Sequence, residues 1–144
     1  MLLKEKLTEP FIVMNGDILS LVKFDEMYKY ALSQDSLLTI SVKKEVTPFS
    51  FGNIFFDGNT VTGIEEKPDM ITYILAGIYV MKPDIFKFFP EDEYFGMDHL
   101  IKKMLGAGEK IVKYNITDYW LDIGRIDDYY KAQEAAKHFG GEKE

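Results

Sequence analysis

Short runs of apolar residues recur along the chain and predict β-strands. A strand that is buried on both faces reads as a nearly continuous apolar run bounded by turn-forming residues. A run of this kind occupies residues 11–15, and further strands are predicted at residues 37–42, 73–81, 111–115 and 117–121. Each segment is too short for a typical helix.

Between these runs, apolar residues fall at helical spacing. Residues 24–34, 98–105 and 126–138 each place their apolar side chains on one helical face. Pro83 is expected to begin a further helix that ends at residue 88 or 89, because proline is well tolerated in a first helical turn. The chain therefore predicts helices between most of its strands.

One hairpin can also be predicted. Residues 51–56 and 60–64 are rich in aromatic and β-branched residues, and Asp57-Gly58-Asn59 joins them. Asp-Gly supplies the positive φ that a tight hairpin turn requires. Strands and helices thus alternate around one core, with added antiparallel pairing, and residues 1–144 are predicted to form a single α/β domain with a mixed sheet.

Composition restricts the class of function. The 144 residues carry a net charge of −7, which argues against non-specific nucleic-acid binding, because phosphate backbones are bound by excess Lys and Arg. The absence of cysteine excludes disulfides and thiolate catalysis and is typical of a reducing compartment. No apolar run approaches the ~18 residues of a membrane span, and residues 1–5 lack the apolar core of a signal peptide. We therefore expect a cytoplasmic protein that does not bind membranes.

Two of the apolar runs end in an acidic residue. Asn15-Gly16-Asp17 follows the first run, and Asp122 follows Tyr119-Trp120-Leu121. Open α/β sheets bind ligands at the carboxyl ends of their strands. Two carboxylates there would suit Mg²⁺, which takes oxygen ligands and is usually shared with substrate phosphates. The alternative is structural, since Asp at a strand end also forms turns and caps helices.

Two small residues, Ala76-Gly77, interrupt the middle of the run at residues 73–81. Small residues in a central strand weaken its packing and usually mark close approach by a ligand or by another backbone. The alternative is that Gly77 only relieves crowding inside the sheet.

Four segments in a fixed order resemble a known enzyme family. They are Asn15-Gly16-Asp17, Gly63-Ile64-Glu65-Glu66-Lys67-Pro68, Ala76-Gly77-Ile78-Tyr79-Val80 and Trp120-Leu121-Asp122-Ile123-Gly124-Arg125. In this order and at these separations they resemble the Rossmann-like nucleotidyltransferases that make nucleotide sugars. The likeness is to the mannose-1-phosphate guanylyltransferase and glucose-1-phosphate thymidylyltransferase branches, and it extends from Phe11 to about Lys137.

The resemblance implies a reaction and a set of site residues. The family joins a sugar 1-phosphate to a nucleoside triphosphate and releases pyrophosphate. By resemblance, Asp17 and Asp122 hold Mg²⁺ against the nucleotide phosphates and Lys67 contacts the sugar phosphate. Glu66 would accept hydrogen bonds from sugar hydroxyls, and the backbone of Gly77 would approach the sugar.

Several of these residues also have structural interpretations. Residues 65–68 could form a solvated turn, and Trp120 is expected to belong to the core rather than to a sugar platform. His99 and His138 lack partners at metal-ligand spacing, so we interpret both as structural or exposed. The phenylalanines at 86, 88 and 89 are expected to belong to the core.

The sequence departs from the family pattern in two places. Leu75 stands where many relatives carry Asn, which removes a polar contact expected for the sugar. The family's glycine-rich loop with Gly-Thr-Arg and its Pro-Lys pair have no counterpart in the chain. The resemblance therefore implies the carboxyl-terminal part of the catalytic domain, with negligible transferase activity as an isolated chain, because losing even one transition-state donor costs on the order of 10²-fold.

The absent segment has consequences for partners. Without the family's first strand, the strand at residues 11–15 would leave one edge unpaired. We expect a homodimer that covers this edge, and a separately encoded amino-terminal half is the second expected partner. The alternative function is a non-catalytic module that binds a sugar phosphate or serves in protein interaction.

Overall fold

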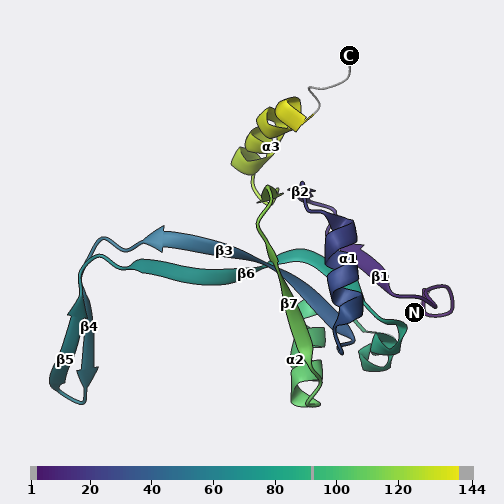
Figure 1. Cartoon of the computed structure of the whole chain (residues 1–144), viewed down its shortest axis with the longest axis horizontal. Coiled ribbons are helices and arrows are strands. Elements are labelled where there is room, and N and C mark those ends of the chain that lie inside the picture. Colours follow the sequence, from purple (N-terminus) through teal and green to yellow (C-terminus); the bar gives the residue numbers. More distant parts are fainter. Residues whose placement is uncertain (1–2, 92, 140–144) are drawn as a thin grey trace.

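A mixed sheet of four strands forms the centre of the molecule (Figure 1). The computed structural model describes residues 3–91 and 93–139. The strand order is β1-β6-β3-β7, with β6 antiparallel to both neighbours and β3 parallel to β7. These strands are β1 (Phe11–Met14), β3 (Leu38–Pro48), β6 (Asp69–Met81) and β7 (Ile111–Ile116).

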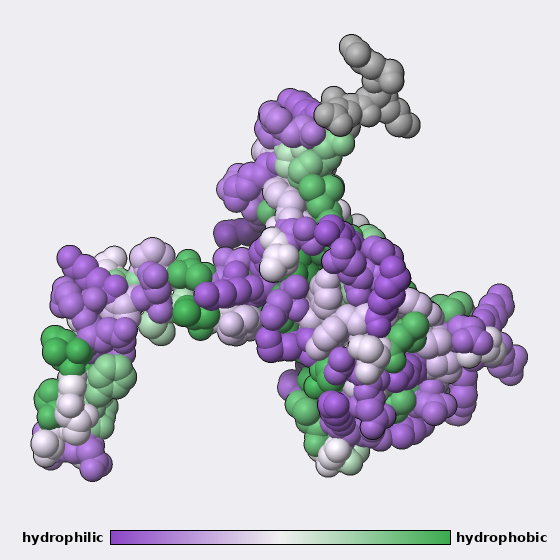
Figure 2. Space-filling model, in the orientation of Figure 1, coloured by the Kyte–Doolittle hydropathy of each residue, from purple (hydrophilic) through white to green (hydrophobic). Residues whose placement is uncertain are grey.

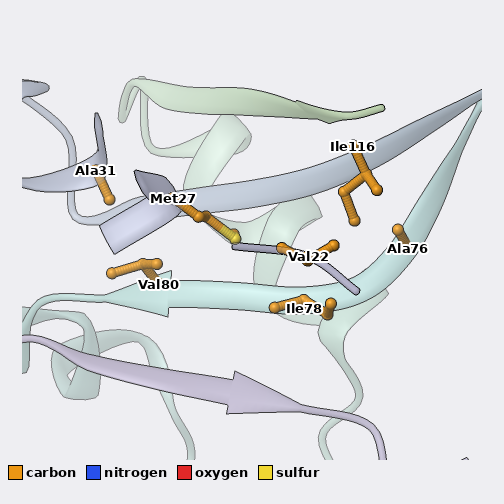
Figure 3. Close-up of a cluster of buried hydrophobic side chains, with 7 residues drawn as sticks. All are labelled: Val22, Met27, Ala31, Ala76, Ile78, Val80 and Ile116. Carbon is orange, nitrogen blue, oxygen red and sulfur yellow. The ribbon is translucent and has the colours of Figure 1, made fainter. Parts of the chain in front are cut away.

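Helix α1 (Phe24–Ser33) covers one face of this sheet. Its buried residues Met27 and Ala31 pack against the small and branched side chains at even-numbered positions of β6. The side chains at odd-numbered positions point to the other face of the sheet. Figure 3 shows this cluster between α1, the strands and the segment after β2; its buried members are Val22, Met27, Ala31, Ala76, Ile78, Val80 and Ile116.

The opposite face is covered by the 3₁₀ helix η1 (Pro83–Phe88) and by α2 (Met97–Gly106). The odd-numbered residues Tyr79 and Met81 of β6 point to this side. They form a second buried cluster with Leu38, Ile85, Phe88, Leu100 and Met104. β6 contributes side chains to both clusters, and helices flank both faces of the sheet. This arrangement confirms the predicted α/β class. The core, which was predicted to be one, consists of two clusters.

The prediction that the first strand is buried on both faces is wrong. Among the described residues β1 pairs with β6 alone and forms one edge of the sheet. Phe11 and Val13 pack against the second cluster, whereas Ile12 and Met14 are each 38% exposed. Successive side chains of a strand point to opposite faces of the sheet. One face of β1 packs against the second cluster, and the side chains of its other face are partly exposed to solvent.

Strands β3 and β6 continue beyond the sheet as a two-stranded arm. Their pairing runs out to Pro48 opposite Asp69, so both strands are longer than the apolar runs predicted. At the end of the arm lies the predicted hairpin of β4 (Asn53–Asp57) and β5 (Thr60–Glu65). Gly58 adopts φ 56° in its turn, as the Asp-Gly pair predicts. Green apolar surface is visible along the arm and hairpin in Figure 2.

A second two-stranded sheet joins distant parts of the chain. β2 (Ile18–Ser20) pairs antiparallel with β8 (Trp120–Asp122), and α3 (Ile126–Phe139) follows. The three predicted α-helices are confirmed to within a residue or two at each end. β2 was not predicted, because three residues carry no recognisable period. Within the described ranges, no helix has the length and apolar character needed to cross a bilayer.

Candidate active site

The β2–β8 pairing brings the backbones of Asp17 and Asp122 close together. Ile18 lies directly opposite Asp122 in the ladder. One residue further, the Ile123 N–H donates a hydrogen bond of 2.7 Å to the Asp17 carbonyl oxygen. Two residues separated by about a hundred positions therefore sit on neighbouring backbones, at the turn after β1 and at the end of β8.

The residues after Asp122 leave room for its carboxylate. A Cβ added at Gly124 would lie 3.0 Å from the Asp122 Oδ2, so that carboxylate folds over the glycine. Both Asp17 and Asp122 are exposed and present hard oxygen donors. In the described part of the chain, no group of three or more His, Cys, Asp or Glu is placed to hold a metal. Carboxylate oxygens are the kind of ligand that Mg²⁺ takes, so each of the two residues has suitable chemistry.

A cleft of about 450 Å³ opens beside these strands. One part of its wall is apolar and another is acidic, and no Lys or Arg is present among its lining residues that the structure describes. The lining residues are Asn15, Ile74, Leu75, Ala76, Gly77, Tyr79, Trp120, Leu121, Asp122 and Asp128. The cleft can therefore hold a ligand with an apolar face, and by itself it offers no positive charge for a phosphate.

Gly77 is required by the way the Asn15–Asp17 turn packs. Its φ is +67°, in the left-handed region that favours glycine. A Cβ there would lie 2.5 Å from Ile18 Cδ1 and 2.8 Å from Asn15 Nδ2. The close approach predicted from the small residues is thus made by the segment that carries Asp17.

A β-bulge creates this position. The register between β3 and β6 shifts between Ile40 and Val42, opposite the stretch that contains Gly77. The Ile78 N–H is released from the ladder and donates to the buried Ser41 Oγ at 3.2 Å. Bulges redirect side chains next to active sites, and here the bulge bends β6 at the cleft.

Trp120 serves both the packing and the cleft. It is half-buried against the first cluster and also lines the cleft. Its Nε1–H donates to the Ala76 carbonyl oxygen at 2.8 Å, which ties β8 to the bulge. The expectation of a purely core residue is therefore only partly correct. Tyr79, which also lines the cleft, is buried, and burial raises the pKa of its hydroxyl above the ordinary value.

Asn15 and Asp128 were missed as cleft residues. Asn15 belongs to the quoted Asn-Gly-Asp motif, which was the available signal. Asp128 lies in the first turn of α3 and pairs with Lys131 at 2.9 Å. Its place in the cleft depends on where α3 stands, so no local pattern indicates it.

Glu66 and Lys67 lie away from this cleft. Both are exposed and follow β5 at the junction of the hairpin and the arm (Figure 1). Lys67 adopts φ 48°, which is unusual for a residue with a side chain. From Asp69 to Gly77, β6 spans roughly 26 Å at about 3.3 Å per residue. The structure therefore places Asp122 and Gly77 at the cleft and the Asp17 backbone beside β8, and Glu66 and Lys67 stand apart from them.

The two histidines have surroundings that fit the structural interpretation. The His99 Nδ1 accepts a hydrogen bond from the Gly96 N–H at 3.3 Å, at the start of α2. His138 is exposed near the end of α3, with Nδ1 2.9 Å from the Glu134 carbonyl oxygen. Neither lines the cleft.

Comparison with known proteins identifies the family of the chain. The family model described as nucleotidyl transferase matches residues 1–138. A glucose-1-phosphate adenylyltransferase of Clostridium perfringens is 30% identical over 138 residues, which cover 86% of this chain and 35% of the relative. The mannose-1-phosphate guanylyltransferase catalytic subunit beta of Drosophila melanogaster is 25% identical, covering 85% of this chain and 34% of its own length.

A solved structure shares the fold. The crystal structure of HddC from Yersinia pseudotuberculosis is 27% identical and superposes with a TM-score of 0.64, covering 93% of this chain and 59% of that chain. The chain spans about a third of the length of the curated relatives it matches. The four motifs, the family match and the superposition agree, and the chain therefore belongs to the nucleotidyl transferase family, as the resemblance of its motifs predicted.

Proposed function

We propose that this chain supplies the carboxylate part of a site that transfers a nucleotidyl group from a nucleoside triphosphate to a sugar 1-phosphate. In this reaction an oxygen of the sugar phosphate attacks the α-phosphorus and forms a new P–O bond. The bond from the α-phosphorus to its bridging oxygen breaks, and pyrophosphate leaves with the electron pair. The reaction requires two anionic reactants to be held in line.

The observation that carries the proposal is the β2–β8 ladder, which sets Asp17 and Asp122 on adjacent backbones beside a cleft. We assign both carboxylates to Mg²⁺ binding. When bound there, Mg²⁺ would neutralise phosphate charge during the transfer. Gly77 would contribute by holding the Asn15–Asp17 turn in place.

The remaining part of the site needs positive charge. The lining residues of the cleft that the structure describes include no Lys or Arg, and phosphoryl transfer depends on cations and amide donors aimed at the phosphates. We propose that a separate polypeptide supplies them, corresponding to the amino-terminal half expected from the family. Glu66 and Lys67 would reach the sugar phosphate only after the arm bends toward the cleft.

A second candidate function is a non-catalytic module that binds a sugar phosphate or another protein. The observation in its favour is the same lack of cations in the cleft, together with the distance along β6 between Lys67 and Gly77. Such a module would bind without catalysing transfer.

Calorimetric titration of the chain tests the assignment of the metal site. We expect Mg²⁺ binding that Asp122→Asn weakens by about tenfold or more, since even outer-shell changes at metal sites cost that much. The control Asp57→Asn changes an exposed turn residue of the hairpin and should bind like the wild type. Equal Mg²⁺ binding by both variants, or none by the wild type, would contradict the assignment of the metal site.

The substrates are then titrated in the presence of Mg²⁺. Mannose 1-phosphate and glucose 1-phosphate test the sugar side, and GTP and dTTP test the nucleotide side. Sugar-phosphate binding that disappears in Lys67→Ala but survives in Lys44→Ala, an exposed lysine of the same arm, would support the substrate role of Lys67. Binding unchanged in Lys67→Ala would contradict it.

A further inference from the structure

Asp128 differs from the acidic residue next to it on α3. Its side chain is only 21% exposed and lines the cleft, although most residues of this helix are exposed. Asp127 lies in the same first turn, is exposed, and is not among the described lining residues of the cleft. The fold therefore sets one of two adjacent carboxylates against the cleft.

Lys131 holds this carboxylate in place. Its Nζ donates to the Asp128 Oδ1 at 2.9 Å, from three residues further along the helix. The lysine side chain is 65% exposed, so the pair meets water on the lysine side and the cleft on the aspartate side. An ionised carboxylate offers about four acceptor positions on its two oxygens. Asp128 can therefore still accept hydrogen bonds from a ligand.

The chemistry of Asp128 restricts what it can bind. An ionised carboxylate accepts hydrogen bonds and donates none, so a ligand must offer it a donor. Phosphate oxygens are acceptors, and the two carboxylates of the cleft, Asp122 and Asp128, repel them. Sugar hydroxyls are uncharged donors. The C–H groups of a sugar ring can at the same time contact the apolar part of the wall, which includes Ile74 and Leu121.

We propose that Asp128 contacts the sugar ring of the substrate and accepts hydrogen bonds from its hydroxyl groups, with Lys131 as the residue that positions it. The inference rests on the proposed transfer to a sugar 1-phosphate, and it adds which part of that substrate lies beside α3. Glu66, to which the motifs assign the sugar hydroxyls, follows β5 at the hairpin, away from the cleft. Asp128 is the carboxylate that the fold already places there.

The fluorescence of Trp120 reports binding, because it is the only tryptophan of the chain and lines the cleft. Glucose 1-phosphate and mannose 1-phosphate are titrated into the full chain with Mg²⁺ present. We expect Asp128→Asn to weaken the tighter of the two by about tenfold or more, the contribution of a hydrogen bond to a charged group. The matched control, Asp127→Asn, removes the same charge from the same helical turn and should bind like the wild type.

The outcomes separate this contact from the proposed function. Equal affinities in Asp128→Asn and the wild type would overturn the contact and leave the proposed function standing. An equal loss in Asp127→Asn would assign the effect to general charge and would also overturn the contact. If neither sugar phosphate binds to the wild type, the sugar side of the proposed function fails together with this inference.

A Mg²⁺ titration of Asp128→Asn excludes a metal role. The variant should keep the wild-type affinity for Mg²⁺, because the contact is made with the sugar. A tenfold loss of Mg²⁺ affinity would make Asp128 a metal ligand and overturn the proposal. Weaker binding of GTP with unchanged binding of both sugar phosphates would also overturn it, because the carboxylate would then contact the nucleotide.

Lys131→Met tests the positioning role. Without the ammonium group the Asp128 carboxylate loses its fixed orientation, so we expect the sugar-phosphate affinity to fall several-fold. Lys131→Arg should restore it, because a guanidinium also donates to a carboxylate. The loss should also appear with glucose, since a lysine that only attracted the phosphate would not affect a neutral sugar.

The control for Lys131 is Lys137→Met. Lys137 pairs with Glu134 at the same spacing on the same helix, and neither is among the described lining residues of the cleft. Sugar binding should therefore be unchanged in this variant. No loss in Lys131→Met, or an equal loss in Lys137→Met, would show that Lys131 does not position Asp128.

Discussion

At the residue scale, Gly77 connects the conformation of the sheet to the placement of the acidic groups. Its left-handed backbone lies in the bulge of β6, and the side chains of Asn15 and Ile18 occupy the space that a Cβ would need. Asp17 lies between those two residues in the chain. The position of its carboxylate therefore depends on a glycine sixty residues away.

We expect Gly77→Ala to lower the free energy of unfolding by about 2–4 kcal/mol, from left-handed strain plus overpacking. The control is Gly58→Ala in the hairpin turn, which also has a positive φ but nothing within 4 Å of the added Cβ. That variant should lose only the strain, about 1–2 kcal/mol. Urea unfolding of both measures the difference, and equal losses would show that packing at Gly77 is unimportant.

Ser41 stabilises the same bulge by a hydrogen bond. Removing its hydroxyl leaves the buried Ile78 N–H without its acceptor, and an unsatisfied buried donor costs about 1–3 kcal/mol. We expect Ser41→Ala to lower the unfolding free energy by this amount. Ser33→Ala is the control, because the Ser33 hydroxyl donates to the Tyr30 carbonyl at an exposed position, and its effect should stay within about 0.5 kcal/mol. Similar losses in the two variants would contradict a role for Ser41 in the bulge.

At the element scale, the arm of β3 and β6 differs from the rest of the sheet. Directly opposite pairs share a face in an antiparallel ladder, so Val46 with Ile71 and Val42 with Leu75 lie on one face of the arm, with Lys44 and Tyr73 between them. Beyond the main sheet no described helix covers that face in Figure 1. Two-stranded ribbons are only marginally stable in water without packing, so the arm depends on its junction with the sheet.

We therefore expect amide protons of the arm to exchange with solvent much faster than those of the sheet centre. The residues to compare are 43–47 of β3 and 78–81 of β6, because the latter are buried between the two clusters. Local opening free energies fall where apolar contacts are few. Hydrogen exchange measured by NMR checks this. Equal protection in both segments would mean that something covers the arm in solution.

At the scale of the whole molecule, the predicted site residues fall into two groups. Asp122 and Gly77 line the cleft, with the Asp17 backbone beside β8, and Glu66 and Lys67 lie at the base of the hairpin. Figure 1 shows the hairpin at the far end of the arm from β2. The arm thus decides whether the second group can act on a ligand bound by the first.

Paramagnetic broadening by Mn²⁺ measures this separation. Bound between Asp17 and Asp122, Mn²⁺ should broaden the amide signals of Ile18 and Gly77 and leave that of Lys67 sharp, because broadening falls steeply with distance. Asp17→Asn should reduce the broadening at Gly77. A Lys67 signal that broadens in the wild type would contradict the extended arm and place the lysine near the cleft.

The sequence by itself determined the local conformations and the family. Helical spacing, the Asp-Gly turn and the four motifs are signals carried by neighbouring residues, and the corresponding helices, hairpin and family match agree with them. The rule that strand ends carry ligands grouped Asp17 with Asp122, and their backbones are neighbours in the fold, although the sequence contained no sign of β2.

Only the tertiary structure decided which strands are neighbours. An apolar run specifies a strand but not its partners, so the arm of β3 and β6 and the position of Asp128 were not predictable from the chain. Strand pairing and burial depend on residues far apart in sequence. For the same reason the sequence grouped Lys67 with Asp122 by motif, and the fold separates them along the length of β6.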